Sequence, residues 1–575
     1  MPFVVKLFRG FQMIGGFLRK MARKALARPL YKKFARFEAA CTTPQATQEA
    51  LLRSILAYHA DTGFGSDHGF AHIKTVADYR RQVPVAPYER LDPYIRRVMA
   101  GDTKALLADP QVLMFALTSG TTAARKHIPI TQQYVDDYRR SWNLWGLKAI
   151  KQHKHVFLKP IMQLAGDADE YRTDAGIPCG NLSGFTAQVQ KRIMRWMYVV
   201  PPASGKLKDS QTRTYVAVRM GLRKPLGMLM SANPSTLVNL ARFMDREKEA
   251  LIRDIHDGTL NPKLEIPADI RAILSKKLKP KQTRAKELEG FANASGHLFP
   301  KDAWPADKLL IGCWTGGSVG PYLRQLSNFY GDAPIRDLGL LASEGRMSIP
   351  VEDGTPSGVL DVTTHFFDFI PEGEIDSPNP TALGAHEVQE GKHYYIVMTT
   401  KAGLYRYHIS DLVRVTGFFH NTPTIEFLGK GSRFANLTGE KLSEHHVTQS
   451  VDRLVQTIDQ PLTAYALAPC WDETQPYYGL FLESQDAQDS PLLRRFLTAL
   501  DLALGENNIE YEAKRSSGRL GALRAHTLPT GFWANWDRER VAKSGGSPEQ
   551  YKHPCLIGDM AFAQSILGTG GRVAA

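Results

Sequence analysis

A short polar loop between two apolar runs is the segment best suited to hold an anion. The apolar run from Val112 to Leu117 stops abruptly, and an alternating apolar and polar pattern resumes at His127. Small residues let backbone N–H groups approach phosphate oxygens, while hydroxyl and cationic side chains add hydrogen bonds and positive charge. The loop supplies these groups through Thr118, Ser119, Gly120, Thr121, Thr122, Arg125 and Lys126. It lacks the Gly-Lys-Ser/Thr that opens a helix in the Walker pattern, so we predict a phosphate loop of another kind between two strands.

A carboxylate, Glu344, is the next candidate. It follows a short apolar run at residues 337–342 and comes directly after Ser343. Such a run predicts a strand, and the carboxylate is expected at the strand end. Mg²⁺ prefers hard oxygen ligands and is often held by one carboxylate together with phosphate oxygens. Glu344 is therefore a candidate magnesium ligand; the structural alternative is a solvated charge.

A third segment, residues 399–411, reads as an aromatic and basic strand that ends in a carboxylate. Its candidate site residues are Tyr407 and Asp411, because an aspartate here can accept hydrogen bonds from both hydroxyls of a ribose. In the structural alternative, Asp411 is an edge-strand carboxylate that pairs with Arg406 or Arg414.

Two cationic positions complete the set. A flexible, charged junction includes Arg433, and Lys552 stands in the otherwise uncharged segment 550–554. Taken singly, each of these segments is better explained by an ordinary structural role. Their order along the chain carries the information.

Length and composition set the limits on the fold. At 575 residues the chain is too long for one ordinary core, so two or more domains are expected. Its hydrophobic content of 43% and charged content of 23% are typical of a soluble globular protein. The five cysteines have no paired spacing, which indicates buried or incidental thiols in a reducing, cytoplasmic compartment and neither a disulfide framework nor a zinc site.

The formal charge of +14 is concentrated at one end. Residues 1–37 hold ten Lys and Arg and no Asp or Glu, so the rest of the chain carries only +4. A nucleic-acid-binding surface over the whole body is therefore not indicated.

The basic N-terminal segment also has helical periodicity, with apolar side chains on one face and cations on the other. Such a helix could lie peripherally on the anionic inner surface of a membrane. Alternatively, it packs on the protein body and leaves its basic face in solvent. Gly10, Gly15 and Gly16 weaken the helix. Neither a secretory signal nor a run of transmembrane length is expected.

Apolar runs alternate with helical patterns along the rest of the chain, which indicates an α/β fold. Thr131 is positioned to cap a helix over residues 132–150. A turn at residues 231–235 starts a helix that is predicted to run to about Asp257. Strands are expected within residues 308–411, where apolar runs are separated by Gly, Pro and Asp; the runs are Leu309–Trp314, Val359–Phe369 and Tyr394–Thr399.

Three parts are predicted. Residues 1–37 form the basic amphipathic segment, and residues 38–429 form a large domain of β-sheets flanked by helices. Residues 430–575 form a small, mobile α+β domain. The boundary is placed at the flexible junction Gly429–Ser432.

In order, these segments resemble the motifs of the adenylate-forming superfamily, to which firefly luciferase belongs. In more detail the chain is similar to the Gretchen Hagen acyl acid–amido synthetases, an auxin-responsive plant family with bacterial relatives, and it is identified as a bacterial member. The resemblance covers residues 40–560. It rests on Gly403-Leu404-Tyr405-Arg406-Tyr407, Val413-Arg414-Val415-Thr416-Gly417-Phe418, Thr438-Gly439-Glu440-Lys441, Gln550-Tyr551-Lys552, Asn233-Pro234-Ser235 and Phe369-Ile370-Pro371.

The chain departs from the family pattern at three motifs. Ala124 replaces the last Gly of a phosphate loop that is also one residue shorter, which can tighten or shift the phosphate cradle. Leu340 and Leu341 replace a Tyr and an Ala ahead of the Ser-Glu pair, so stacking on the base is put in doubt. Ser410 replaces the Gly of Tyr-Arg-Val-Gly-Asp. The motif residues that still match are Ser343, Glu344, Tyr407 and Asp411.

The resemblance implies an AMP-forming ligase. A carboxylic acid attacks the α-phosphorus of ATP, which gives an acyl-adenylate and pyrophosphate. An amine, usually of an amino acid, then attacks the acyl carbon and releases AMP. The loop at 118–126 would bind phosphates, and Glu344 would hold Mg²⁺. Asp411 would bind the ribose, with Arg433 as a second contact. Lys552 would reach the α-phosphate when the small domain, which forms the adenylation domain's cap, swings closed about the junction.

Two alternatives remain open at this stage. One is an acyl-CoA ligase of the same superfamily. The other is a catalytically degenerate ATP-binding protein that serves as a membrane-associated interaction module.

The acid pocket is expected between the segment after Ser231 and the turn at Trp314–Gly317, and Met228 and Met230 favour an apolar or aromatic acid.

Overall fold

The computed structural model describes residues 31–118, 125–164, 166–190, 192–317, 319–375, 377, 379–431, 434–435, 437–438, 440, 442–458, 460, 462–471, 475–487, 491–544 and 551–567. Residues 1–30, on which most of the predicted amphipathic helix falls, and residues 119–124 of the predicted phosphate loop lie outside the described residues.

The strand–loop–strand prediction is confirmed. β1 (Met114–Thr118) and β2 (Lys126–Ile130) pair in antiparallel fashion on either side of the loop. They belong to a four-stranded sheet in the order β2-β1-β5-β4, in which β5 (Pro178–Gly180) runs parallel to β1 and β4 (Tyr171–Arg172) closes the edge. The loop thus leaves from the end of a buried strand.

A second sheet is wholly parallel, in the order β3-β6-β7-β8. Its strands are β3 (Ile161–Gln163), β6 (Met228–Met230), β7 (Leu310–Gly312) and β8 (Ile335–Arg336). Parallel strands need helical crossovers, and all three residues of both β6 and β7 are buried, as expected for a sheet covered on its two faces.

The third sheet is antiparallel and has six strands in the order β11-β12-β16-β15-β14-β13. Its long strands are β13 (Phe366–Pro371), β14 (His393–Thr399), β15 (Tyr407–Phe419) and β16 (Thr422–Lys430), with β11 (Ser348–Ile349) and β12 (Gly358–Leu360) at one edge. The predicted run Val359–Phe369 is therefore two strands, β12 and β13, separated by a turn. The Tyr-x-x-x-Asp motif forms the start of β15.

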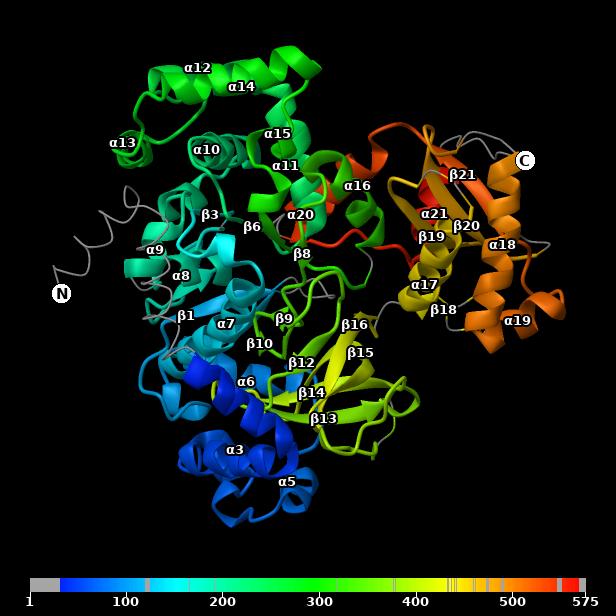
Figure 1. Cartoon of the computed structure of the whole chain (residues 1–575). Coiled ribbons are helices and arrows are strands. Elements are labelled where there is room, and N and C mark those ends of the chain that lie inside the picture. Colours follow the sequence, from blue (N-terminus) through cyan, green and yellow to red (C-terminus); the bar gives the residue numbers. More distant parts are fainter. Residues whose placement is uncertain are drawn as a thin grey trace.

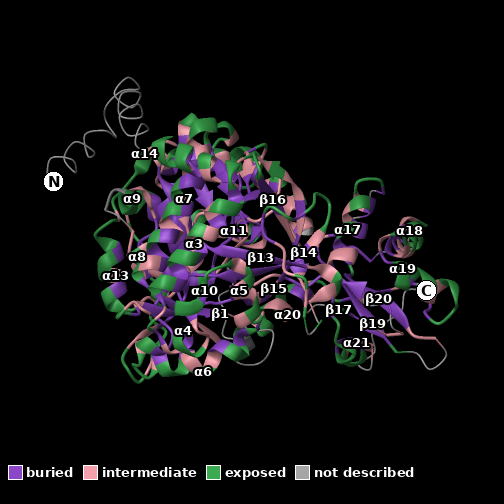
Figure 2. Ribbon diagram, turned by 90° about the horizontal axis from the view of Figure 1, so that it is seen from below, coloured by how far each residue is buried: buried purple, intermediate pink, exposed green. Residues whose placement is uncertain are grey.

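Helices pack around these sheets, and Figure 2 shows buried strands inside an outer layer of helices with exposed faces. α7 (Gln132–Gln152) begins as predicted, because the Thr131 side chain accepts a hydrogen bond from the backbone N–H of Tyr134. Residues 31–42 are helical, and Phe34 and Phe37 are buried in the main core. The packed body therefore includes residues on the N-terminal side of the predicted boundary at residue 38.

The single long helix predicted after residue 231 is wrong in one respect. The structure has α11 (Pro234–Arg246) and α12 (Lys248–Asp257), which are separated at Glu247. Glu247 has φ −98° and ψ 12°, which ends the first helix and lets the second set off separately. Periodicity alone continues across such a break because the apolar spacing is maintained.

The C-terminal part has its own core around a three-stranded sheet, β19-β20-β21. Figure 1 shows much of it as a separate lobe, coloured from yellow to red. Its elements are α17 (Glu444–Val455), β19 (Tyr465–Cys470), β20 (Tyr477–Glu483), α18 (Pro491–Asn507), α19 (Ile509–Ser516), β21 (Arg524–Leu528), α20 (Phe532–Ser544) and α21 (Met560–Leu567).

All five cysteines are buried as free thiols, as the sequence predicted. Burial raises the pKa of Cys41 to about 12 and those of Cys179 and Cys470 to about 11. Within the described ranges, no helix combines the length and the apolar character that crossing a bilayer requires.

Candidate functional site

A cavity of about 980 Å³ gathers predicted site residues from distant parts of the chain. They come from β1, β2, β15, a tight turn after β8 and the segment that follows α20. The predicted residues that line it are Thr118, Lys126, Ser343, Glu344, Tyr407, Asp411 and Lys552.

The remaining predicted residues are not brought to this cavity by the described structure. Ser119, Gly120, Thr121, Thr122 and Arg433 lie outside the described residues. Arg125 is described, but it does not line the cavity. Its guanidinium instead forms an ion pair with Glu170, at 3.0 Å.

Glu344 lies in a hairpin turn, whereas the sequence predicted a simple strand end. β9 (Leu341–Ala342) and β10 (Gly345–Arg346) pair directly, so that Ser343 and Glu344 form the two-residue turn. Tyr134 secures the turn by donating its hydroxyl hydrogen to the Ser343 carbonyl, at 3.0 Å. Gly345 is required for packing, since a Cβ there would come within 2.5 Å of His365 Nε2.

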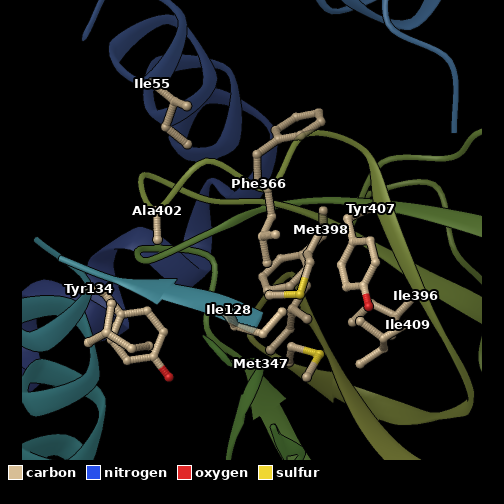
Figure 3. Packing of buried hydrophobic residues seen from close by; sticks show 14 of the residues in the cluster. Ile55, Ile128, Tyr134, Met347, Phe366, Ile396, Met398, Ala402, Tyr407 and Ile409 are labelled. Atoms are coloured by element: carbon tan, nitrogen blue, oxygen red, sulfur yellow. The ribbon is translucent and has the colours of Figure 1, made fainter. Parts of the chain in front are cut away.

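The Glu344 carboxylate is almost buried and is oriented by Tyr407. Glu344 is 6% exposed, and the Tyr407 hydroxyl donates to its Oε1 at 3.2 Å. Burial, and next the charge of Glu344, raise the pKa of Tyr407 well above its usual range, so the phenol stays a donor. Figure 3 shows the Tyr407 ring among Ile396, Met398 and Ile409, all members of the main core.

Asp411 does not have the partners that the structural alternative proposed. Arg406 pairs with Asp368 at 2.9 Å, and Arg414 pairs with Glu426 at 2.7 Å. Asp411 pairs instead with Lys430, which faces it across the β15–β16 ladder and also lines the cavity. Lys430 was not predicted as a site residue, because only the strand register brings it opposite Asp411.

A β-bulge sets the direction of the Asp411 side chain. Between β14 and β15, Tyr395 pairs with Leu412 and Val397 with His408, so β15 has extra residues in between. Ser410 lies in this bulge with φ 61°, in the left-handed region that favours glycine. The serine thus occupies, in this conformation, the position at which the family motif has glycine.

Lys552 enters the cavity from the C-terminal part and meets aromatic rings. Its ammonium lies 4.3 Å from the ring centroid of Trp314 and 4.4 Å from that of Phe427. Nearby Asp337 is buried, and burial raises its pKa against the opposing effects of hydrogen bonds from Gly339 and Thr315 and of the Lys552 charge.

Another stretch of the cavity wall is aromatic and apolar. Tyr138, Trp142, Met230 and Leu340 line it, together with Ser231 and Trp314 from the predicted acid pocket. The Arg346 guanidinium lies 4.3 Å from the Trp142 ring centroid, and burial lowers the pKa of Arg346 to about 10. This wall suits an apolar or aromatic ligand.

The charges that line the cavity suit a polyphosphate with a bound cation. Lys126, Lys430 and Lys552 can neutralise phosphate oxygens, while Glu344 supplies one carboxylate. Across the described part of the chain, no group of three His, Cys, Asp or Glu side chains could hold a metal ion by itself. A divalent cation here would therefore take most of its ligands from phosphate and water, which is the usual arrangement for Mg²⁺.

Three domain profiles of one family match consecutive parts of the chain. The GH3 family N-terminal domain matches residues 33–335, the GH3 family central domain residues 358–430, and the GH3 family C-terminal domain residues 445–561. Together they span most of the sequence.

Curated relatives match over nearly their whole length. The jasmonoyl–L-amino acid synthetase JAR4 of Nicotiana attenuata is 24% identical, and the match covers 89% of this chain and 91% of that one. The probable indole-3-acetic acid-amido synthetase GH3.12 of Oryza sativa subsp. japonica is 25% identical, over 94% and 95% of the two chains.

Solved structures share the fold. An acyl acid amido synthetase, AtGH3.15, in complex with 2,4-DB superposes with a TM-score of 0.82 at 19% identity, over 94% of this chain and 96% of that one. A 2-hydroxyisobutyryl-CoA ligase in complex with 2-HIB-AMP superposes with a TM-score of 0.53 at 12% identity, over 92% and 93%.

Proposed function

Because the chain belongs to the GH3 family, we propose that it is an ATP-dependent acyl acid–amido synthetase. It adenylates a carboxylic acid with release of pyrophosphate. It then transfers the acyl group to an amine, most simply that of an amino acid, with release of AMP. The enzyme is thus an AMP-forming carbon–nitrogen ligase.

One observation supports this assignment above the others. Lys552, near the C-terminus, lines the same cavity as Glu344, Tyr407 and Asp411. Phosphoryl and adenylyl transfer need positioned charges more than covalent help from the protein. A cavity in which lysines lie near the Glu344 carboxylate, itself oriented by Tyr407, meets that need.

We assign nucleotide binding to residues at the ends of β1, β2 and β15. Thr118 and Lys126 flank the loop that we propose for the phosphates. Within the loop, hydrogen bonds to the phosphates would come from Ser119, Gly120, Thr121 and Thr122. Arg125 would contribute less directly to phosphate binding, because its side chain pairs with Glu170. Asp411 would accept hydrogen bonds from the ribose hydroxyls, and Arg433 would assist. This use of Asp411 requires its ion pair with Lys430 to open or to share the carboxylate.

Glu344 is the residue that we propose to hold Mg²⁺, with Ser343 beside it in the turn. Bound there, the ion would neutralise phosphate charge during adenylation. The Tyr407 hydroxyl fixes the carboxylate by its hydrogen bond to Oε1, which leaves the other oxygen for a ligand.

The acid would lie against the aromatic wall, with its carboxylate toward the nucleotide. Tyr138 and Trp142 of α7, with Met230 and Leu340, favour a hydrophobic or aromatic acid. The border between the adenylation domain and the cap domain is proposed at residues 429–432, where β16 ends. A swing of the C-terminal part about this border would separate the two half-reactions.

The test is an acid-dependent assay. Purified full-length protein is mixed with ATP, Mg²⁺ and a panel of apolar and aromatic acids, and pyrophosphate release is measured. A positive acid is then supplied with amino acids and coenzyme A together, and the products are identified by mass spectrometry. An amide supports the proposal, a thioester would favour the CoA ligase alternative, and no release with any acid would favour the degenerate ATP-binding protein.

A further inference from the structure

The segment that carries Lys552 is gripped by the large domain at two adjacent residues. The Asn233 side-chain amide donates a hydrogen bond to the Tyr551 carbonyl. The next residue, Lys552, places its ammonium over the rings of Trp314 and Phe427, 4.3 and 4.4 Å from their centroids. The three gripping residues come from the start of α11, the end of β7 and the end of β16.

The large-domain side of this grip is held by contacts of its own. The Trp314 indole N–H donates to the Gly339 carbonyl at 3.1 Å, and the Trp314 backbone N–H donates to the Ala232 carbonyl at 2.9 Å. Gly317 has φ 74°, and a Cβ there would come within 3.1 Å of the Phe427 ring. The turn after Trp314 is therefore shaped to let the Phe427 ring lie close.

On the other side, Lys552 belongs to a segment fixed to the C-terminal core. The Glu444 carboxylate accepts a hydrogen bond from the backbone N–H of Cys555 at 2.8 Å. The His553 ring contacts the Asp537 carboxylate at 2.9 Å and the Tyr465 carbonyl at 3.1 Å. Contacts that fix Tyr551 and Lys552 therefore also fix the position of the C-terminal part as a whole.

The contacts to Lys552 suit a residue that must also act. Ring faces attract an ammonium electrostatically and carry no net charge, so these two contacts do not neutralise Lys552. The grip is also limited in strength, as a contact that must be released between half-reactions needs to be.

We propose that Asn233, Trp314 and Phe427 are positioning residues that form a docking latch for Lys552. The latch holds the C-terminal part in the arrangement for adenylation and releases it for amide formation. This inference rests on the proposed function, because it concerns the lysine of that same site. It predicts that the two half-reactions respond differently to a weaker latch: adenylation slows, while the rate of acyl transfer stays the same.

Two substitutions isolate the latch from the fold. Asn233→Ser keeps an oxygen to cap α11, where Asn233 Oδ1 now accepts from the Ser235 N–H at 3.0 Å, but removes the amide donor. Phe427→Leu keeps an apolar side chain and removes the ring face. Phe418→Leu is the matched control, since Phe418 is an exposed phenylalanine of the same sheet that does not line the cavity.

The experiment measures the two half-reactions separately, with an acid found in the screen. Acid-dependent ATP–pyrophosphate exchange reports adenylation, and amide formation from chemically prepared acyl-adenylate reports transfer. Asn233→Ser and Phe427→Leu should each lower the exchange kcat by about tenfold while KM for ATP and transfer stay within about twofold. Phe418→Leu should match the parent protein in both assays.

Equal slowing of both half-reactions, or no slowing of either, would overturn the latch. Failure of the proposed function looks different: the parent protein would show no exchange with any acid. Small-angle scattering then decides on the latch alone, because the two latch variants should have a larger radius of gyration than the parent and Phe418→Leu should not. Equal radii would reject it.

Discussion

Asp411 and Lys430 form an ion pair across adjacent strands, with Asp411 Oδ1 2.5 Å from Lys430 Nζ. The aspartate side chain is 4% exposed and the lysine side chain 35%, so the pair joins a buried carboxylate to a cation that reaches solvent. Lys430 is also the last residue of β16 and lies within the proposed border between the domains, residues 429–432. The pair therefore links the proposed ribose site to the point about which the C-terminal part would turn.

Asp411→Asn should weaken ATP binding. A hydrogen bond to a charged group is worth about 1.5–3 kcal/mol, so KM for ATP should rise by about 10- to 100-fold. Pyrophosphate release at varied ATP measures this. Asp559→Asn, at an exposed carboxylate that lines the same cavity, is the control and should leave KM within about twofold. An unchanged KM in Asp411→Asn would remove Asp411 from the ribose site.

Glu344→Gln should raise the magnesium requirement. Glutamine keeps an acceptor for the Tyr407 hydroxyl and nearly the same shape, but it lacks the charge that a hard cation prefers. The Mg²⁺ concentration for half-maximal pyrophosphate release should increase by at least about tenfold. Tyr407→Phe, which removes only the orienting hydroxyl, should have the smaller effect. The assignment fails if Glu344→Gln titrates with Mg²⁺ like the parent.

Ser410→Gly should stabilise the protein. Ser410 has φ 61°, a conformation that costs an L-residue about 1–2 kcal/mol and glycine nothing, and the greater freedom of glycine in the unfolded chain offsets about half of the gain. The expected net change is about 0.5–1 kcal/mol, visible as a higher urea midpoint. Ser410→Ala keeps the strain and should show no increase; an equal gain in both variants would contradict the backbone explanation.

Stability should fall on acidification, in part through His445. Burial, and next the charges of His393 and His446, lower the pKa of His445 to about 4, with Glu372 opposing and Arg414 adding to the effect. The unfolded chain takes up this proton near pH 6.5 and the folded protein only near pH 4, so the stability contributed by neutral His445 is present above pH 6.5 and is lost between these values.

The measurement is the thermal midpoint between pH 7.5 and pH 5. Since burial also lowers the pKa values of His59, His365 and His526 to about 4, the parent protein should lose stability as the pH falls from about 6.5 to 5 and change little above that. His445→Asn should lose less on acidification, whereas Asn at the exposed His72 should reproduce the parent's pH dependence. Parallel curves for parent and His445→Asn would exclude this role.

Removal of residues 1–30 should leave acid-dependent pyrophosphate release within about twofold, because every described residue of the cavity lies at or after Thr118. Removal of residues 1–37 should destabilise the protein, because Phe34 and Phe37 would be lost from the core. Binding of both forms to anionic vesicles separates the alternatives for the basic segment. If removal of residues 1–30 abolished vesicle binding, the membrane interpretation would be favoured; if it unfolded the protein, the packed-helix interpretation would be.

Local signals predicted a large part of the fold. The strands on either side of residues 119–124 and the helix capped by Thr131 were predicted because apolar spacing and capping chemistry act over a few residues. The break at Glu247 was missed, since backbone angles can change at one residue without any change in apolar period. β12 and β13 were predicted as one strand, because the buried Val362 in the turn between them continues the apolar run.

The candidate site was predictable only as an ordered set of motifs. Glu344 was expected at a strand end, and its place in a two-residue hairpin turn was not predicted. That turn depends on the pairing of β9 with β10, which sequence spacing does not reveal. Lys430 was missed because its relation to Asp411 is set by strand register, and sequence spacing carries no sign of it. Phe427 was missed likewise: its ring matters only where the C-terminal part delivers Lys552.

The burial of all five cysteines has a practical consequence. Thiol reagents attack the thiolate, and buried thiols with raised pKa values offer little of it at neutral pH. The native protein should therefore react very little with maleimide dyes. A pair of cysteines introduced on the surface, one on each side of residue 430, would take up donor and acceptor dyes selectively, and energy transfer between them would follow the C-terminal part through a catalytic cycle in single molecules.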